Sequence, residues 1–379
     1  MQWRVPLADV EMTDADIDAI AATYRSGWLS MGPRIAEFEA AFAEYAGAAH
    51  AIAVASGTAA LHLQALAAGI GPGDEVVVPS MTFVATVNAI RYTGATPVFA
   101  DILSPAEPWL SAAAVERVLT PRTRAIAFVS YGGHAGTLAA IAELAAGRDL
   151  ILLHDAAHAV GARLDGTPLG GIAAASAYSF FSNKNLALGE GGMVTTGDEA
   201  LAARVRLLRS HGMTAVSWDR ARGHASGYDV VELGFNHRLD EPRAALGLER
   251  LRRLDADTAR RAALVARYRS ALDGVVERCL PPAPGSDPAH HLFTILVAPG
   301  ADREAVRALI AEQGVQTSVH YPPAHRFAIY ADSGAELPVT DEYAARTITL
   351  PLFAHMTAEQ QDLVVAAVAG AVAAASPVA

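Results

Sequence analysis

The chain has 379 residues, 52% of them hydrophobic, so it can fill the core of one large domain or of two domains. Its formal net charge of −11 argues against nucleic acid or an anionic membrane as a partner, although a local basic pocket for a phosphorylated substrate is compatible with it. The single cysteine, Cys279, excludes an intramolecular disulfide framework and a cysteine-rich metal site, and we expect no metal.

We expect neither a secretory signal nor a membrane-spanning segment from the two ends of this sequence. The N-terminal segment carries acidic residues at Asp9, Glu11, Asp14 and Asp16 and lacks the basic and then apolar stretch of a signal peptide. The Ala/Val run at residues 363–375 is too short to cross a bilayer and predicts a closing helix. We therefore expect a cytoplasmic protein without a membrane partner.

Between about residues 51 and 196, short β-branched runs alternate with helical stretches. This alternation predicts an α/β fold with a largely parallel sheet and helices on its faces. Helices are expected at residues 58–68 and 84–92, with Gly69 and Gly94 as their stops. The strand candidates are AIAVAS, EVVVPS, TPVFAD, RAIAFVS, LILLHD, SAYSFF and GMVTT.

The pattern changes after Asn236, where long charged helices are expected over LDEPRAALGLERLRRL and the following DADTARRAALVARYRSAL. A weaker mixture of strands and helices continues to residue 375. We therefore predict a large domain over residues 1–249 and a smaller C-terminal α+β domain over residues 250–379, with the N-terminal segment free to pack on the smaller domain. PPAPGSDP, residues 281–288, is interpreted as a surface loop within it.

Ser56-Gly57-Thr58 follows a predicted strand and opens a predicted helix. Ligands bind at the carboxyl ends of strands in open α/β sheets, and a helix N-terminus favours an anion there. The segment is therefore a candidate phosphate site. Helix capping alone is an equally physical explanation, because serine and threonine cap helices without any ligand.

Asp155 closes the apolar strand LILLH, so its carboxylate lies at a strand end. A buried aspartate needs a cation or a strong donor, and a protonated pyridine nitrogen would serve. The alternative is a helix N-cap. His158 follows one turn later, where it either contacts a cofactor or simply packs. Phe83 lies at another strand-to-helix junction and either stacks on a flat ring or joins the core.

Lys184 lies in SFFSNKNLALGEGG, residues 179–192, between a short apolar strand and a glycine-rich turn. A lysine that is partly desolvated on a rigid element has a lowered pKa and can attack a carbonyl to form a Schiff base. Gly189, Gly191 and Gly192 suit a turn in which the backbone approaches a ligand closely. The alternative is a solvated loop lysine.

In this order, the motifs resemble those of fold-type I enzymes that use pyridoxal 5′-phosphate (PLP), specifically the DegT/DnrJ/StrS family of sugar aminotransferases. The resemblance runs from about Ser26 to Leu352. Its best pieces are SGTAALHLQAL, GPGDEVVVPSMTFVATVNAI, HDAAHAVGA, SFFSNKNLALGEGGMVTT, GFNHRLDEPRAALGL and VHYPPAH.

The resemblance implies roles around the ring of the cofactor. Lys184 would form the Schiff base with PLP and act as the catalytic lysine. Asp155 would contact the pyridine nitrogen, His158 would lie near the phenolic oxygen, and Phe83 would stack on the ring.

The resemblance also implies how the phosphate would be held, by Gly57, Thr58, Ala59 and Ser179. Asn236 matches an asparagine that reaches the phosphate of the neighbouring subunit in the family. Because the family's active sites lie at a subunit interface, we expect at least a homodimer with shared sites.

Three positions depart from the usual pattern of the family. His154 stands where an acid commonly precedes the aspartate, His158 where glutamine is frequent, and Phe181 where histidine is frequent. None of these removes a required group. Lys184 itself favours transamination, because relatives that dehydrate sugars carry histidine at that position.

Substrate contacts are expected from two regions. Residues 211–229 have no strong secondary-structure period and are a candidate loop over the site, in which Arg220 and Arg222 either meet a diphosphate or are surface charges. Trp28, His320 and Tyr321 lie in family-like motifs near the substrate end.

The reaction expected from the resemblance is a ping-pong transamination in which an amino acid, with glutamate as the expected donor, gives its amine to a keto-sugar. The expected acceptor is a nucleotide-linked 3- or 4-keto-deoxysugar. An enzyme acting on a nucleotide-free cyclic ketone, by cyclitol transamination or an aromatising elimination, is the nearest alternative. A non-catalytic regulatory protein with the same fold is a further one, although no basic recognition helix supports it.

Overall fold

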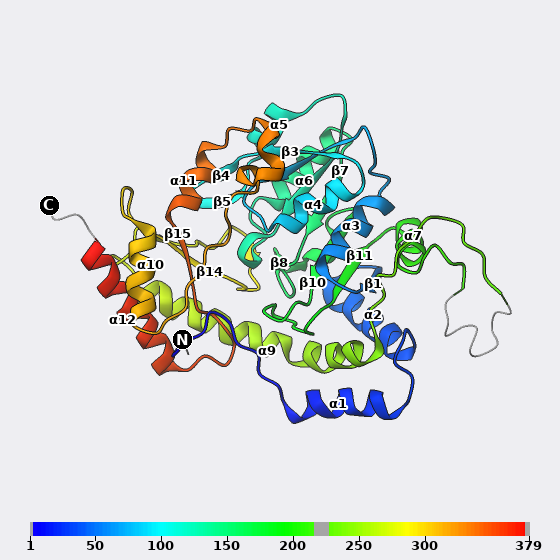
Figure 1. Ribbon diagram of the computed structural model, residues 1–379, viewed down its shortest axis with the longest axis horizontal. Coiled ribbons are helices and arrows are strands. Elements are labelled where there is room, and N and C mark those ends of the chain that lie inside the picture. Colours follow the sequence, from blue (N-terminus) through cyan, green and yellow to red (C-terminus); the bar gives the residue numbers. More distant parts are fainter. Residues whose placement is uncertain (1–2, 216–226, 376–379) are drawn as a thin grey trace.

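The computed structural model describes residues 3–215 and 227–375 and is built around a seven-stranded sheet in the order β1-β11-β10-β7-β6-β2-β3 (Figure 1). Strand β11 is antiparallel to β1 and β10, and the other neighbours pair in parallel. The prediction of an α/β fold with a mainly parallel sheet is confirmed, with every predicted strand present. The strands are β1 (His50–Val54), β2 (Glu75–Pro79), β3 (Thr96–Ala100), β6 (Thr123–Val129), β7 (Ile151–Asp155), β10 (Ala175–Ser179) and β11 (Gly192–Thr196).

Helices cover both faces of this sheet, which explains why strands such as EVVVP in β2 are buried throughout. Helices α2 (Pro33–Ala46), α5 (Ala112–Val118) and α6 (Leu138–Gly147) pack into one core. Helices α3 (Gly57–Ala67), α4 (Val84–Tyr92) and α7 (Glu199–Arg209) pack into cores on the other face. The two predicted helices match α3 and α4, and Gly69 and Gly94 follow their ends with φ of 83° and 87°, which glycine adopts at little cost.

A second core surrounds an antiparallel sheet in the order β12-β14-β15, formed by Arg278–Cys279, Phe293–Leu296 and Thr347–Leu350. Helices α10 (Arg303–Glu312) and α12 (Ala358–Ala375) belong to this core, and α11 (Pro338–Arg346) precedes β15. The N-terminal segment joins it, because Val5 is buried there and forms a parallel bridge with Val315.

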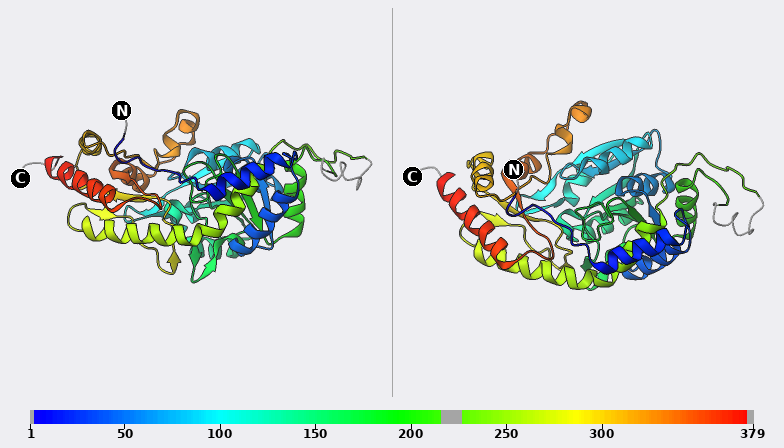
Figure 2. Two further views of the ribbon diagram at one scale, coloured as in Figure 1. Left: turned by 90° about the horizontal axis from the view of Figure 1, so that it is seen from below. Right: turned by 60° about the horizontal axis from the view of Figure 1, so that its bottom comes forward.

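Helix α9 (Glu241–Ala271) runs through both parts of the molecule (Figure 2). Its first half packs on α2 and on α1 (Asp14–Arg25), whereas Val265 and Tyr268 near its end belong to the second core. The two charged helices expected from the sequence are thus one helix of 31 residues. The predicted boundary at residue 249 falls inside it and stays a prediction.

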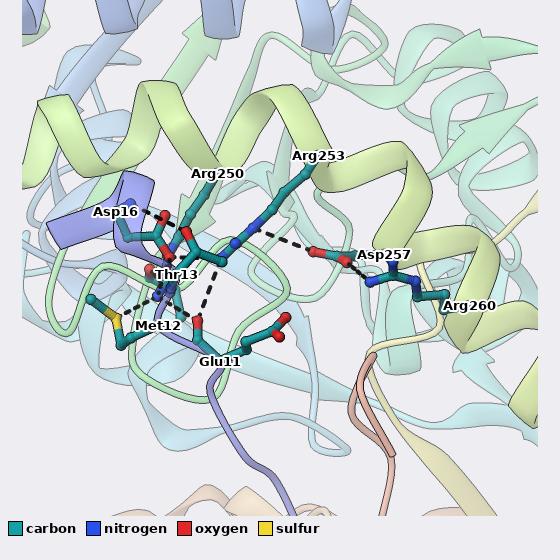
Figure 3. Close-up of polar contacts among 9 residues, drawn as sticks. Glu11, Met12, Thr13, Asp16, Arg250, Arg253, Asp257 and Arg260 are labelled. Atoms are coloured by element: carbon teal, nitrogen blue, oxygen red, sulfur yellow. Dashed lines mark hydrogen bonds and ion pairs between the residues drawn. The ribbon is translucent and has the colours of Figure 1, made fainter. Parts of the chain in front are cut away.

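A buried charge cluster fixes the N-terminal segment to α9 (Figure 3). Asp16 is only 1% exposed, and it forms a capping box at the start of α1 with the N-cap residue Thr13. Its carboxylate also accepts a hydrogen bond of 2.9 Å from Arg253. Arg250 lies 3.5 Å from the same carboxylate and donates to the carbonyl oxygens of Glu11 and Ala187. Arg250 therefore links the N-terminal segment to the loop that follows Lys184.

Five short strands complete the described strands: β4 (Ile102–Ser104), β5 (Glu107–Leu110), β8 (Arg163–Leu164), β9 (Thr167–Pro168) and β13 (Ser286–Asp287). The predicted loop at residues 281–288 contains β13, which pairs with β8, so part of this loop is a strand. Among the described residues, no helix combines the length and the apolar character that crossing a membrane requires.

Candidate active site

A pocket of about 380 Å³ lies at the carboxyl ends of the sheet strands. Strands β1 and β10 both run antiparallel to β11, so their last residues, Val54 and Ser179, pair with the same residue, Gly192. This register brings the segments after β1 and β10 together at one edge. The pocket is lined by residues 56–58, Leu61, Thr82, Phe83, Ala85, Val129, Asp155, Ala157, His158, Ser179, Phe181, Asn183, Lys184, Glu190, His320 and Tyr321.

The N-terminus of α3 forms one wall of the pocket. Ser56 is its N-cap and accepts a hydrogen bond of 3.1 Å from the Ala59 N–H, as the capping alternative predicted. The N–H groups of Gly57 and Thr58 have no acceptor within the helix, because the first turn offers none. A Cβ on Gly57 would lie 2.6 Å from the Ser179 Cβ, so glycine is what allows this wall to meet Ser179.

The expected role of Ala59 at the phosphate stays a prediction. Its N–H is already used by Ser56, and the residue does not line the pocket. Of the four residues expected around a phosphate, Gly57, Thr58 and Ser179 line the pocket and Ala59 does not.

Asp155 ends β7 and is buried at the pocket. Its Oδ2 accepts a hydrogen bond of 2.6 Å from Thr86, and its Oδ1 accepts one of 3.0 Å from the Ala157 N–H. Burial raises the pKa of Asp155, while both hydrogen bonds and the charge of Lys184 oppose that rise. The carboxylate is thus held in a dry site where a cationic partner would be stabilised strongly.

Lys184 lies in the loop between β10 and β11, and its backbone N–H donates a hydrogen bond of 2.9 Å to the Phe181 carbonyl. Burial lowers the pKa of its amine to about 8, although the Asp155 carboxylate acts in the opposite direction. Much of the amine is therefore neutral in mildly alkaline solution, as a nucleophile requires. Lys184 is the only lysine among all 379 residues, so the remaining 28 of the 29 basic side chains are arginines.

The sequence interpretation missed two neighbours of Lys184. His291, which is buried just before β14, places Nε2 3.3 Å from the Lys184 Nζ. Its Nδ1 lies 3.3 Å from the Asn185 Oδ1. His291 carries no local signal, because 107 positions separate it from Lys184, and Asn185 directly follows Lys184 but its contact depends on this distant histidine.

His158, Tyr321, Phe83 and His320 meet beside the lysine. The His158 Nε2 lies 2.9 Å from the Tyr321 hydroxyl, and the Tyr321 ring lies 5.8 Å from that of Phe83. His320 places Nδ1 2.9 Å from the Thr349 hydroxyl, and burial lowers its pKa to about 4. Burial and the charge of Lys184 also hold the pKa of His158 well below its usual range, so these imidazoles are neutral at pH 7.

Two of the other predicted site residues, Trp28 and Asn236, do not line this pocket. Trp28 lines a separate depression beside α1, α2 and α9, where its Nε1–H donates to the Met31 carbonyl at 3.0 Å. Asn236 is exposed and forms a bridge with Ser210. Arg220 and Arg222 lie outside the described residues.

The fold and this pocket define a PLP-dependent aminotransferase of fold-type I. Residues 10–369 match the DegT/DnrJ/EryC1/StrS aminotransferase family, and the chain belongs to that family. The protein is therefore an aminotransferase. Its likeness to sugar aminotransferases makes it a sugar aminotransferase that acts on small molecules.

Three relatives illustrate the likeness. The spore coat polysaccharide biosynthesis protein SpsC of Bacillus subtilis (strain 168) is 40% identical over 385 aligned residues, covering 97% of this chain and 96% of SpsC. The sugar aminotransferase CalS13 of Micromonospora echinospora is 30% identical, with a TM-score of 0.87 over 97% of this chain and 99% of CalS13. The PLP form of Spr1654 from Streptococcus pneumoniae is 26% identical, with a TM-score of 0.92 over 98% of this chain and all of that one.

The residues in the pocket fit the cofactor that the family implies, PLP. The buried Asp155 carboxylate suits a protonated pyridine nitrogen, and the N-terminus of α3, brought against Ser179 by the side-chain-free Gly57, suits a phosphate. Lys184 supplies an amine in the same pocket.

Proposed function

We propose that the protein transfers the amino group of an amino acid, with glutamate as the donor, to a nucleotide-linked 3- or 4-keto-deoxysugar. One observation carries the proposal: the only lysine of the chain lies buried in the same pocket as the buried Asp155 carboxylate. We further propose that PLP is attached covalently to Lys184 and that the protein works in the cytoplasm, which its single cysteine supports.

In this proposal, each residue has a defined task. When bound, PLP serves as an electron sink for the bond broken at the donor's α-carbon. Asp155 holds the proton on the pyridine nitrogen, and Phe83 covers one face of the ring. The Lys184 Nζ, once released, takes the proton from the donor's α-carbon and later gives a proton to the carbon that receives the amine.

The phosphate is assigned to Gly57, Thr58 and Ser179, with Asn236 reaching it from the neighbouring subunit of a homodimer. The exposed position of Asn236, outside its own pocket, supports this assignment. Next to it, Leu233 is 87% exposed and Val231 is 58% exposed, and an apolar segment of this kind suits a subunit interface.

A product screen tests the proposal. Purified protein loaded with PLP is incubated with glutamate or glutamine and a panel of keto-sugars, both nucleotide-linked and free, together with cyclic ketones, and the products are identified by mass spectrometry. We expect an aminated nucleotide sugar with the wild-type protein and none with Lys184→Ala. Amination of nucleotide-free ketones alone would contradict the proposed acceptor, and full activity in Lys184→Ala would contradict the proposed chemistry.

A further inference from the structure

A chain of hydrogen bonds leads from the backbone of residue 289 to the amine of Lys184. The Asn185 Nδ2 donates a hydrogen bond of 2.6 Å to the Ala289 carbonyl. Only the amide nitrogen of asparagine can donate to a carbonyl, so this contact fixes which end of the Asn185 side chain faces Ala289. The Oδ1 is thereby turned toward His291, at 3.3 Å from its Nδ1.

This orientation selects one tautomer of His291. Because the Asn185 Oδ1 can only accept, the His291 Nδ1 must carry the proton, and Nε2 is left with a lone pair. Nε2 is the atom that lies 3.3 Å from the Lys184 Nζ. Lys184 therefore donates to an acceptor whose direction and tautomer are set by residues on two separate segments.

The His291 ring is held in place independently of Lys184. The backbone N–H of His291 donates to the Gly132 carbonyl at 3.1 Å, and the backbone N–H of Ala289 donates to the Gly133 carbonyl at 2.8 Å. The ring packs on His158 with 4.3 Å between the ring centres. Gly133 has φ of 89°, and a Cβ there would lie 2.7 Å from the His158 carbonyl oxygen, so only glycine permits this close arrangement.

We propose that His291, with its tautomer set by Asn185, is a positioning residue that holds the released amine of Lys184 at a fixed point of the pocket. This role rests on the proposed function, in which Lys184 is freed from the cofactor when the amino donor binds. An amine on a flexible four-carbon chain would otherwise sample many positions, and holding it in one reduces the entropy lost when it transfers a proton.

Four groups from different segments act on the Lys184 amine. Asp155 at the end of β7 favours the ammonium form. His158, His291 and His320 lie near it, and burial and then the charge of Lys184 lower the pKa of each of them. A neutral His291 that accepts a hydrogen bond favours the ammonium form, so its removal must lower the pKa of Lys184.

The pKa of Lys184 can be measured directly, because the chain has one lysine and labelling with [ε-¹³C]lysine therefore marks a single side chain. Its resonance is titrated by NMR in the cofactor-free chain, without any turnover. His291→Phe is expected to lower the midpoint by about one pH unit, which corresponds to a tenfold change in proton affinity. Asn185→Leu is expected to lower it too, because the tautomer of His291 is then no longer fixed.

The double variant separates positioning from packing. If Asn185 acts through His291, then Asn185→Leu must cause no further shift in the His291→Phe background, whereas additive shifts would overturn the proposal. His291→Gln, which keeps an acceptor oxygen, should remain near the wild-type midpoint. Should His291→Phe not fold, Asn185→Leu alone carries the test, and a wild-type midpoint in that variant would overturn the proposal. A wild-type midpoint in both His291→Phe and Asn185→Leu would also overturn the proposal.

His290→Asn is the matched control. This adjacent histidine contacts the ring of His134 at 6.3 Å, and its φ of 50° is one that asparagine tolerates. The titration midpoint of Lys184 in His290→Asn should equal that in the wild-type protein. Failure of the keto-sugar screen would remove the proposed function while leaving this titration unchanged, so the two outcomes are distinguishable.

Discussion

Thr86 donates a hydrogen bond of 2.6 Å to Asp155 from the first turns of α4, and the Thr82 hydroxyl in turn lies 2.7 Å from that of Thr86. The carboxylate at the end of β7 is therefore oriented by a neighbouring strand-to-helix junction, with both threonines buried. Burial raises the pKa of Asp155, and the hydrogen bond from Thr86 lowers it and so favours the ionised carboxylate.

Thr86→Val removes this donor while keeping the shape of the side chain. We expect a loss of about 1.5 to 3 kcal/mol in the free energy of unfolding, the range for a hydrogen bond to a charged group. The loss should be larger at pH 8 than at pH 5, because burial raises the pKa of Asp155 and its carboxylate becomes protonated as the pH falls. Urea unfolding at the two pH values measures it, with Thr86→Ser as the control that keeps the hydroxyl. An equal loss at both pH values would show that Thr86 only packs.

Gly57→Ala tests the close approach of α3 to β10. The new Cβ would lie 2.6 Å from the Ser179 Cβ, so the helix N-terminus has to move away from the strand. We expect a loss of about 1 to 3 kcal/mol in stability, together with weaker binding of inorganic phosphate and of PLP.

Gly71→Ala is the control for this substitution, since a Cβ at residue 71 meets nothing within 4 Å. Adding Ser179→Gly to Gly57→Ala should restore stability, because it removes the side chain with which the new Cβ clashes. It should not restore phosphate binding, because the Ser179 hydroxyl is lost as well. Unchanged phosphate affinity in Gly57→Ala would argue against the assignment of the phosphate to this helix.

The Asp16 cluster predicts a contrast between buried and exposed ion pairs. Asp16→Ala leaves Arg250, whose side chain is 7% exposed, without its counter-charge, and it is expected to cost about 3 kcal/mol in the free energy of unfolding. Glu249→Ala breaks the exposed pair with Arg252 and should cost less than about 0.5 kcal/mol. Equal losses in urea unfolding would mean that the cluster of Figure 3 does not anchor the N-terminal segment.

The pKa of Lys184 predicts how fast the cofactor-free protein captures PLP at different pH values. Only the neutral amine reacts, so the rate should rise with pH around a midpoint of about 8 and level off above it, well below the ordinary lysine value of 10.5. Asp155→Asn should lower the midpoint, because the carboxylate favours the ammonium form. Stopped-flow absorbance measures both. A midpoint near 10, or an upward shift in Asp155→Asn, would contradict this electrostatic account.

The strands and the main chemical groups could be predicted from the sequence, because both have local signals. Strands such as EVVVP are rich in β-branched residues, Asp155 ends one strand, and Lys184 follows another within five residues. Even so, the sequence did not show that the two charged helices join into α9. The junction between Leu254 and Asp255 has no glycine or proline to end a helix, and tertiary contacts on both halves maintain it.

The partners of the catalytic groups could not be predicted, because they depend on contacts between distant segments. Thr86 meets Asp155 across 69 positions, and Asn185 contacts Ala289 across 104. One signal was present and went unused: a chain of 379 residues with a single lysine singles out Lys184 by composition alone.

The central claim, that PLP is bound covalently to Lys184, is tested most directly by reducing the PLP-loaded protein with borohydride and mapping the adduct by mass spectrometry. Because the chain has no other lysine, the N-terminal amine is the only competing site. The account predicts one PLP-derived mass increment per chain, located on the peptide that contains Lys184 and missing from Lys184→Ala. An adduct elsewhere, or an unmodified chain after saturation with PLP, would contradict it.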